Sequence, residues 1–331
     1  MVRIGMTVSR LALALAMAMG FAAARAQPAA KAPEKITLAL QWLTQCQFAG
    51  YYVALEKGYY REEGIDLTIQ PGAADSNPVQ LVTMGAAQFG TRWFADLAGA
   101  VDKGAPVLSI AQIFGSSGLV LVTHANSGIR HPRDFAGRSV GIWFFGNEVQ
   151  FYALLSQVGV DRAKVRISPM QSSLKPFLNG RLDVINTMTY NELPALLRSG
   201  LKGEQLRVFD FIDYGLDFPG DVLFTQRSLL KDRPDLARRM VRATLRGWRD
   251  ALSDPASAVR IVLQHDRTRK LEAQHQRDQM EEVSRLVQLR GRRLGEHSTD
   301  DAGRTIGILA KGGQISRRLA DEEVFTNVFL P

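Results

Sequence analysis

The sequence predicts an α/β protein built from two similar lobes. Along most of the chain, segments with strand-like patterns take turns with segments of helical spacing, which favours mainly parallel sheets flanked by helices. The pattern also repeats: Trp42 and Trp143 each end an apolar strand, and Gly85 and Gly180 each precede a further strand, both pairs being about 100 positions apart. The 331 residues, 46% apolar and 22% charged, are typical of a globular protein with room for two such lobes.

The first 26 residues have the pattern of a secretory signal peptide. Arg3 and Arg10 accompany a short apolar run, Leu11–Gly20, and Ala24–Ala26 is an A-x-A cleavage motif. An uncleaved anchor is the alternative, but the run has about ten residues and a membrane-spanning helix needs about 20. We therefore predict cleavage after Ala26 and a soluble, exported mature protein, since charge or glycine interrupts every later apolar run.

Charge and cysteine content exclude several classes of protein. Loss of three arginines with the signal peptide reduces the net charge from +8 to +5, and the basic residues of the last third alternate with acidic ones. This interleaving is typical of solvated helix faces, so we expect no nucleic-acid partner. Cys46 is the only cysteine, which excludes an internal disulfide, and by default it is a buried core residue. The five histidines lack metal-ligand spacing and no phosphate-binding loop occurs, so we expect no metal and no cofactor.

The elements predicted for the first lobe follow one another from residue 36. Asn77 and Pro78 are a helix-start signal, and a strand that ends at Trp93 follows that helix. The predicted elements are strand 36–42, helix 48–63, strand 65–69, the helix from 78 to Gly85, strand 86–94, and strands 107–114 and 118–124.

The second lobe repeats this order. Strand 138–143 ends in Trp143, a helix opens at Gly146–Glu148, a helix opened by Ser172 and Ser173 stops at Gly180, and strand 182–192 follows. The chain returns to the first lobe near 214 through a strand at 222–229, and helices 234–253 and 255–263 and a charged pair extend to about 293. We therefore predict a first lobe made of 27–125 and 215–331, and a second lobe made of 126–214.

Several segments resemble one known family. QFAGYYVALEKGYYREEGIDLTI, DFAGRSVGIWFFGNEVQF, FLNGRLDVINTMTYNEL, GWRDAL and FTNVFL are similar to the solute-binding proteins of ABC importers, in the group that includes thiamine-pyrimidine and alkanesulfonate binders. The resemblance covers nearly all of the mature chain. It implies a two-lobed periplasmic-binding-protein fold of type II, each lobe being a mainly parallel sheet flanked by helices. It also implies a periplasmic protein that hands its solute to an ABC permease in the inner membrane and acts as a monomer.

The same family contains an enzyme branch that makes the thiamine pyrimidine. That branch is marked by a cysteine-rich iron-binding segment and by a PLP-linked lysine and histidine. This sequence departs from it, because Cys46 is the sole cysteine and a signal peptide is out of place on an intracellular enzyme. We therefore predict a binding protein and no enzyme; the enzyme branch and a sensor ectodomain are the alternatives.

The candidate ligand-binding residues are those that follow the strand ends. In open α/β sheets, ligands bind outside the carboxyl ends of strands and beside helix N-termini. This rule selects Trp42, Gln47, Phe48, Tyr51, Asp75, Asn77, Thr91 and Trp93 in the first lobe, Ser116 and Ser117 at the crossing between lobes, and Trp143, Gly146, Asn147, Glu148, Tyr190, Asn191 and Glu192 in the second.

This set is rich in rings and carboxylates and poor in cations, which favours a flat nitrogen heterocycle. Stacking on an aromatic side chain contributes about 1 to 3 kcal/mol, and Glu148, Glu192 or Asp75 can accept from amino groups. We expect an aminopyrimidine precursor of thiamine, with a flavin next. A sulfonate or nitrate is the alternative, although Arg92 is the only arginine in these loops and such anions favour arginine donors.

Each candidate also has a purely structural interpretation. Trp42 and Trp143 can simply seal the end of a sheet, Phe48 and Tyr51 can belong to the core, and Glu192 can cap the helix that follows it.

Overall fold

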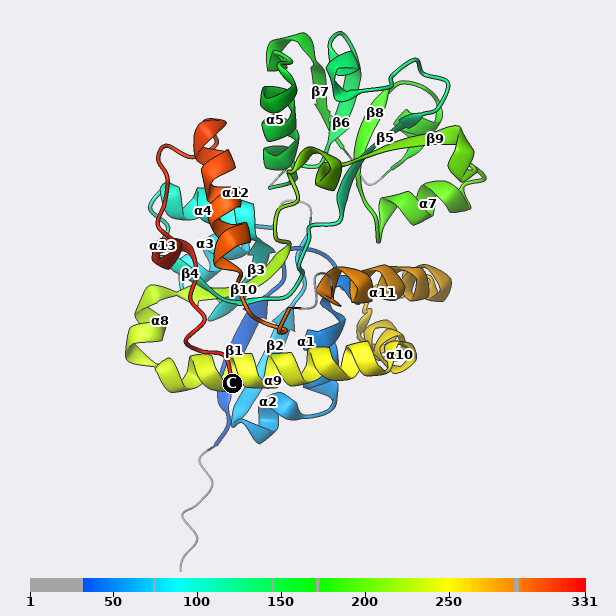
Figure 1. The fold of residues 1–331 in the computed structure, drawn as a ribbon. Helices are drawn as coiled ribbons and strands as arrows, with labels where there is room; N and C mark the ends of the chain where they lie inside the picture. The colour runs from blue at the N-terminus through cyan, green and yellow to red at the C-terminus, as the bar shows by residue number, and fades with distance from the viewer. Residues whose placement is uncertain (1–31, 74–75, 145, 171–172, 289–291) are drawn as a thin grey trace, which may run out of the picture. The chain divides into compact units, whose positions relative to one another are not determined.

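Two five-stranded sheets form the framework of the protein (Figure 1). They are seen in a computed structural model that describes residues 32–73, 76–144, 146–170, 173–288 and 292–331. The predicted signal peptide lies outside the described residues. Pro33–Pro331 form a compact unit of their own, and within the described part of the chain no helix has the length and apolar character that crossing a membrane requires.

The first sheet is mixed, with strand order β2-β1-β3-β10-β4. The pairs β1–β2 and β1–β3 are parallel, and β10 is antiparallel to both β3 and β4. The strands are β1 (Glu34–Ala39), β2 (Ile65–Gln70), β3 (Phe89–Trp93), β4 (Val107–Gln112) and β10 (Asp221–Gln226).

The second sheet has the same arrangement, with strand order β7-β6-β8-β5-β9. Here β6 is parallel to β7 and β8, and β5 is antiparallel to β8 and β9. The strands are β5 (Leu119–His124), β6 (Ser139–Ile142), β7 (Arg166–Pro169), β8 (Val184–Met188) and β9 (Leu206–Asp210). The repeat predicted from the sequence therefore corresponds to two sheets of identical strand order.

One expectation about the sheets is confirmed and one needs correction. As expected, the sheets are mainly parallel: in each of them four strands run in the same direction, and the one strand that enters from the opposite lobe runs antiparallel to its neighbours. The first lobe was expected to reach residue 125, but β5 pairs with β8 and β9 and belongs to the second sheet. The chain therefore crosses between the lobes before Leu119 and returns before Asp221, because β10 lies in the first sheet.

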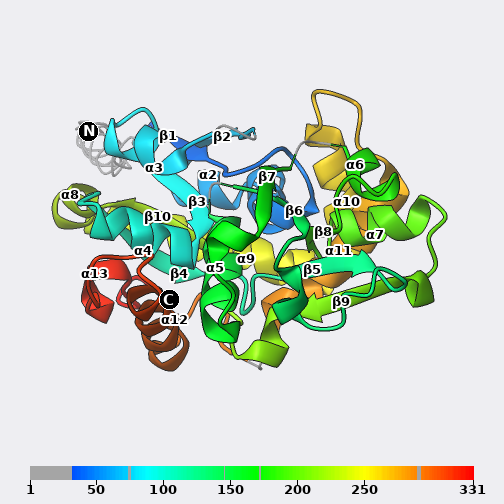
Figure 2. The ribbon, with the colours of Figure 1, turned by 90° about the horizontal axis from the view of Figure 1, so that it is seen from above.

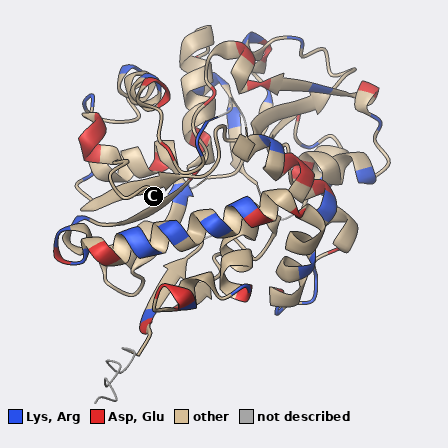
Figure 3. Cartoon of the chain, turned by 60° about the horizontal axis from the view of Figure 1, so that its bottom comes forward, with Lys and Arg blue, Asp and Glu red and all other residues tan. Residues whose placement is uncertain are grey.

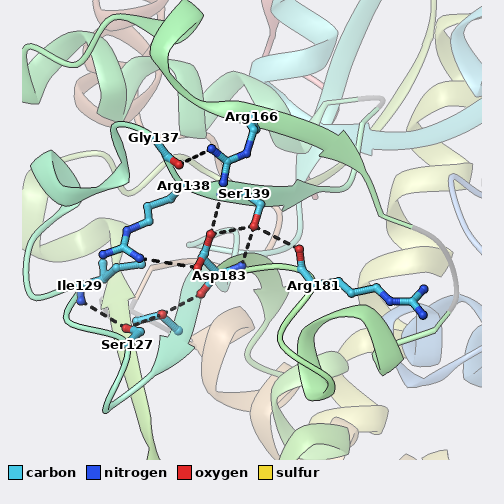
Figure 4. Close-up of polar contacts among 9 residues, drawn as sticks. Ser127, Ile129, Gly137, Arg138, Ser139, Arg166, Arg181 and Asp183 are labelled. Carbon is cyan, nitrogen blue, oxygen red and sulfur yellow. Dashed lines mark hydrogen bonds and ion pairs between the residues drawn. The ribbon is translucent and has the colours of Figure 1, made fainter.

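Equivalent side-chain contacts connect three strands within each sheet. The residue before β8, Asp183, accepts hydrogen bonds from the Ser139 amide at 2.8 Å and from Ser139 Oγ at 2.7 Å (Figure 4). The backbone carbonyl of Asp183 accepts from Thr123 Oγ1 at 2.7 Å. In the first sheet, Gln88 before β3 accepts from the Thr37 amide at 2.9 Å, and its carbonyl accepts from Thr225 Oγ1. These contacts connect β1, β3 and β10 in the first sheet and the corresponding strands β6, β8 and β5 in the second.

Helices cover the faces of the sheets and extend the first lobe. Gly58, with φ of 77°, ends α1, so the helix expected at 48–63 is divided in two. The helices are α1 (Ala49–Glu56), α2 (Tyr59–Glu62), α3 (Pro78–Thr83), α4 (Phe94–Asp102), α5 (Asn147–Val158), α6 (Lys175–Leu178), α7 (Glu192–Arg198), α8 (Arg227–Asp232), α9 (Pro234–Ser253), α10 (Pro255–His265), α11 (Ala273–Gln288), α12 (Thr299–Lys311) and α13 (Asp321–Val324). Short 3-10 turns are Cys46–Phe48, Pro132–Phe135, Arg162–Lys164, Gly203–Gln205 and Phe211–Tyr214. In the view from above, α12 and α13 lie beside α4 (Figure 2), on which they pack.

The core of the first lobe is centred on the crossing of α1 and α9. Tyr51 and Trp248 are buried there and meet edge to face, with ring centroids 5.9 Å apart. A Cβ added to Gly50 would lie 2.2 Å from the Trp248 ring, so only glycine permits this close approach. The outer face of α9 carries a row of basic residues (Figure 3), among which Arg242 pairs with Glu63 at 2.6 Å.

Candidate ligand-binding site between the lobes

A pocket of about 370 Å³ lies where the carboxyl ends of strands from both sheets face one another. Three tryptophans occupy corresponding places at its edge: Trp42 follows β1, Trp93 ends β3 and Trp143 follows β6. The pocket is lined by Gln41, Trp42, Gln45, Gln47, Ala73, Ser76, Arg92, Trp93, Trp143, Phe144, Asn147, Pro169, Met170, Met188, Tyr190, Asn191 and Glu192. Its volume and its mixture of rings with a few polar groups are typical of small-molecule sites.

Trp42 and Trp143 meet across the boundary between the lobes. Their ring centroids lie 5.7 Å apart with an interplanar angle of 77°, an edge-to-face contact. The backbone is held in equivalent ways beside both rings: the amide of Gln41 donates to Thr91 Oγ1 at 3.0 Å, and the amide of Trp143 donates to Asn186 Oδ1 at 2.7 Å. Gln41 and Trp143 are therefore corresponding positions, each fastened to the third strand of its own sheet, and Trp42 is the next residue after the fastened Gln41.

A buried carboxylate organises the polar groups of the first lobe. Asp221, at the start of β10, accepts from Gln41 Nε2 at 2.9 Å and from Gln47 Nε2 at 3.0 and 3.2 Å. Gln47 Oε1 in turn accepts from Gln45 Nε2 at 2.7 Å. Burial raises the pKa of Asp221 to about 7, although the two glutamine donors act to lower it.

The carboxylate also fixes which end of the Gln41 amide faces away from it. The amide nitrogen of Gln41 donates to Asp221, so the amide oxygen lies on the other side of the group and turns away from the carboxyl. Gln41 Oε1 is buried and has no hydrogen-bond partner among the described residues, and the same holds for Trp143 Nε1. Gln41 and Trp143 line the pocket from opposite lobes, and among its described lining residues Gln41 Oε1 and Trp143 Nε1 are the two buried side-chain atoms without a protein partner.

The second lobe contributes a carboxylate of its own. Glu192 Oε2 accepts from the Met188 amide at 2.9 Å and Oε1 accepts from Asn191 Nδ2 at 2.9 Å. Burial raises the pKa of Glu192 above its ordinary value, against the effect of these hydrogen bonds. Glu192 therefore closes the turn between β8 and α7 and also lines the pocket.

The sequence-predicted candidates divide into two groups. Those that line the pocket are Trp42, Gln47, Trp93, Trp143, Asn147, Tyr190, Asn191 and Glu192. Phe48 and Tyr51 are fully buried in the core, because α1 packs this face against α9 and α10. Asp75 lies outside the described residues.

The other candidates have structural partners. Thr91 holds the backbone of Gln41, and Asn77 caps α3 by accepting from the Gln80 amide. Gly146 donates its amide to Glu148, so these two residues close the start of α5, and Glu148 lines a wider neighbouring groove instead of the pocket. In the first crossing between the lobes, Ser116 is hydrogen-bonded to Asp217 and Ser117 donates to Gln150 at 3.1 Å.

The sequence analysis did not identify two parts of the pocket wall: Gln41 in the first lobe, and the residues that follow β7 in the second lobe. Gln41 was assigned to a strand interior, and Pro169 and Met170 follow β7, whose end was not considered. The internal repeat could have found the latter, because Ala73 and Ser76 follow β2, the strand that corresponds to β7. Within the described residues, no group of three or more His, Cys, Asp or Glu side chains could hold a metal ion.

Comparison with known proteins identifies the family. A family profile described as NMT1/THI5 like matches residues 45–258, more than half of the chain. The chain belongs to the NMT1/THI5-like family. This confirms the resemblance in the sequence, although the family includes both binding proteins and synthases.

Three relatives illustrate this range. The chain is 26% identical to the formylaminopyrimidine-binding protein of Halalkalibacterium halodurans over 70% of this chain and 71% of that one. It is 27% identical to the riboflavin-binding protein RibY of Chloroflexus aurantiacus over 100% of this chain and 97% of that one. It is also 27% identical to a 4-amino-5-hydroxymethyl-2-methylpyrimidine phosphate synthase of Legionella pneumophila, over 70% and 73% of the two chains.

The fold is shared with solved periplasmic binding proteins. The periplasmic aliphatic sulphonate binding protein SsuA from Escherichia coli superimposes with a TM-score of 0.69 over 90% of this chain and 94% of that one, at 13% identity. The two-lobed α/β architecture predicted from the sequence is therefore confirmed. At this identity the likeness concerns the fold and not the ligand.

Proposed function

We propose that the protein is an exported, periplasmic solute-binding component of an ABC importer, and that it closes its two lobes on a small planar nitrogen heterocycle. An aminopyrimidine precursor of thiamine is the favoured solute. Relatives that bind a formylaminopyrimidine and riboflavin support a heterocycle, and the shared fold of periplasmic binding proteins supports a transport role with a membrane permease as partner.

One observation carries the choice of solute: the unpaired acceptor Gln41 Oε1 and the unpaired donor Trp143 Nε1 stand on opposite lobes beside the tryptophan-lined pocket. An aminopyrimidine has an amino group that donates next to a ring nitrogen that accepts. Such an edge carries the donor that Gln41 Oε1 requires and the acceptor that Trp143 Nε1 requires, while the flat ring provides a face for the indoles. The solute would thereby join the lobes, and its preference for the closed arrangement would shift the population toward that state.

The size of the pocket leaves room for either solute. A volume of about 370 Å³ lies within the range of sites that hold drug-sized ligands, so it accommodates a substituted pyrimidine and also a flavin. Arg92 and Phe144 line both the pocket and the neighbouring groove, into which the ribityl chain of a flavin could continue. The preference for the pyrimidine therefore rests on the donor and acceptor of its edge and not on size.

An anion such as a sulfonate fits these groups less well. Its oxygens only accept hydrogen bonds, so Gln41 Oε1 would stay unpaired at a cost of about 1 to 3 kcal/mol. The carboxylate of Glu192 would repel it. Arg92 is the only arginine among the lining residues, and its guanidinium is already bonded to Asp96.

The synthase alternative lacks the groups expected of that branch. Cys46 is buried, and burial raises its thiol pKa well above the ordinary value. Lys57, the lysine nearest to the first junction in the sequence, bonds to Asp250 at 2.6 Å and does not line the pocket. Incubation with iron and PLP is therefore expected to produce no Schiff-base absorbance; its appearance would favour the synthase.

Calorimetry with a formylaminopyrimidine, riboflavin and an alkanesulfonate tests the proposal. We expect the pyrimidine to bind most tightly, and the Gln41→Met variant, which keeps the side-chain length but loses both the Oε1 acceptor and the Nε2 donor to Asp221, to bind it at least about tenfold more weakly. The control is Leu43→Ala, because Leu43 follows Trp42 but is 50% exposed and does not line the pocket. Tightest binding of the sulfonate, or equal affinity of both variants and the natural protein for the pyrimidine, would refute this choice of solute.

A further inference from the structure

His275 lies on α11, beside α7 of the second lobe (Figure 1). It is half-buried, and its two ring nitrogens contact two different residues of the second lobe. Nε2 is 2.9 Å from Asn191 Oδ1 at the start of α7, and Nδ1 contacts a guanidinium nitrogen of Arg198 at the end of the same helix. One histidine of the C-terminal helices therefore touches both ends of a helix in the opposite lobe.

These contacts determine the protonation state of the ring. A guanidinium only donates hydrogen bonds, so Nδ1 must carry a free lone pair to accept from Arg198. Nε2 then carries the proton of the neutral imidazole and donates to Asn191 Oδ1. The contacts are consistent only with a neutral His275, because a doubly protonated ring would place an N–H against the Arg198 donor.

The hydrogen bonds continue from His275 to the pocket. Asn191, whose oxygen is held by His275, donates its Nδ2 to Glu192 Oε1 at 2.9 Å. Both residues line the pocket. His275 itself does not line it, so its effect on the site passes through Asn191 and Glu192.

The buried face of α11 contacts the opposite wall of the same pocket. Gln276 Oε1 accepts from the Cys46 amide at 2.8 Å, and Gln279 Nε2 donates to Gln45 Oε1 at 3.3 Å. Gln45 lines the pocket on the first-lobe side. The helix α11 is therefore bonded to first-lobe residues through its buried face, and to second-lobe residues through His275 and through Asp278, which accepts from Arg198 at 2.9 Å.

We propose that His275 is a positioning residue for solute binding: in its neutral form it holds Asn191 and Glu192 of the second lobe against α11, and so keeps the two pocket walls in register. The inference rests on the proposed function for the solute, but the attachment of the lobes is a property of the protein alone. Protonation of His275 disrupts the attachment, because the positive ring then faces Arg198.

The charged groups around His275 determine the direction of the pH effect. Burial is the largest cause that lowers the pKa of His275, and Arg198 lowers it further, while Asp278 and Glu272 on its own segment raise it less. Asp278 is also engaged by Arg198 at 2.9 Å. Since the attached state has the lower pKa, it binds fewer protons, and the attachment is present above the ordinary histidine pKa of about 6.5 and is lost as the pH falls below it.

The test compares three variants from pH 8 to pH 5.5. His275→Gln keeps a donor for Asn191 but does not titrate, His275→Ala removes the contact, and His265→Gln is the matched control because His265 contacts Glu56 within the first lobe. One readout is the affinity for a formylaminopyrimidine. The other is the separation of the lobes without solute, measured by small-angle X-ray scattering.

Between pH 8 and pH 5.5, the natural protein and His265→Gln should each lose affinity for the pyrimidine. We expect their loss to be about tenfold greater than the loss seen for His275→Gln. Asp221 also titrates here, but it is present in all variants, so only the difference between them reports on His275. His275→Ala is expected to bind weakly even at pH 8, with rescue by His275→Gln. Equal pH dependence of the natural protein and His275→Gln in both readouts would overturn the proposal.

The two proposals fail in different ways. If the natural protein binds no heterocycle at any pH, the proposed function is refuted. The scattering measurement without solute then still decides the role of His275: expansion at low pH in the natural protein and in His265→Gln, but not in His275→Gln, supports it.

Discussion

Replacement of Trp143 by alanine tests the site most directly. Trp143 lines the pocket, meets Trp42 with ring centroids 5.7 Å apart, and has an Nε1 donor without a partner among the described residues. The backbone contact that fixes its position comes from its own amide to Asn186 and survives the substitution. The variant therefore removes a ring and a donor but leaves the end of β6 in place.

The magnitude follows from the two lost interactions. Loss of stacking on one ring costs about 1 to 3 kcal/mol, and loss of one hydrogen bond costs about 1 kcal/mol. At 1.4 kcal/mol for each factor of ten, a total of roughly 2 to 4 kcal/mol weakens binding by about 30- to 700-fold. Even the lower part of this range exceeds tenfold, which calorimetry resolves readily.

Calorimetry with a formylaminopyrimidine, combined with thermal unfolding, separates binding from folding. We expect at least a tenfold loss of affinity for Trp143→Ala with a small change in melting temperature, since Trp143 is half-buried and lies at the pocket edge. Trp143→Phe keeps an aromatic ring, so it should lose only the part of the binding free energy that comes from the Nε1 hydrogen bond. Unchanged affinity of Trp143→Ala would contradict the proposed site, because a solute bound in this pocket is expected to contact the Trp143 ring.

Three further changes test other parts of the reasoning. The folded-state pKa of Asp221 is raised from 3.8 to about 7, so its contribution to stability is full below the unfolded pKa and is lost as the pH rises through 7. Between pH 4 and pH 8, the free energy of unfolding of Asp221→Asn, measured by chemical denaturation, should therefore rise by up to about 4 kcal/mol relative to that of the natural protein. A difference that stays constant with pH would refute the burial argument. Gly50→Ala should lower the free energy of unfolding by about 1 to 3 kcal/mol because its Cβ would overlap Trp248, whereas Gly99→Ala in α4, whose Cβ meets nothing within 4 Å, should not; equal melting temperatures would argue against the close crossing of α1 and α9. Gln41→Met should weaken binding of the pyrimidine, measured by calorimetry, by at least about tenfold, the value that corresponds to the loss of one hydrogen bond. For flavins without the ribityl chain, the loss of affinity should not exceed this value.

The internal repeat made much of the fold predictable. Trp42 and Trp143 marked the ends of corresponding strands, and the strand orders of the two sheets are the same. The exchanged strands were not predictable from local pattern, because β5 and β10 have the same apolar character whichever sheet receives them. Their place depends on where the chain crosses between lobes, which is a property of the whole topology.

The candidate site was predicted where it depends on strand ends and missed where it depends on distant partners. Trp42, Trp143 and Glu192 follow strands and so could be placed near the ends of the sheets. The orientation of the Gln41 amide depends on Asp221, which is 180 positions away in the sequence. No spacing rule connects two such residues.

The sequence by itself determined the α/β class, the two similar halves and the aromatic strand ends, because these depend on periodicity and on short-range turn signals. Only the tertiary structure decided that Phe48 and Tyr51 belong to the core, that Gln41 has an unpaired acceptor beside the pocket, and that α11 contacts both lobes. The physical reason is that burial and hydrogen-bond partners are set by contacts between residues far apart in the chain, which the local pattern of a sequence does not encode.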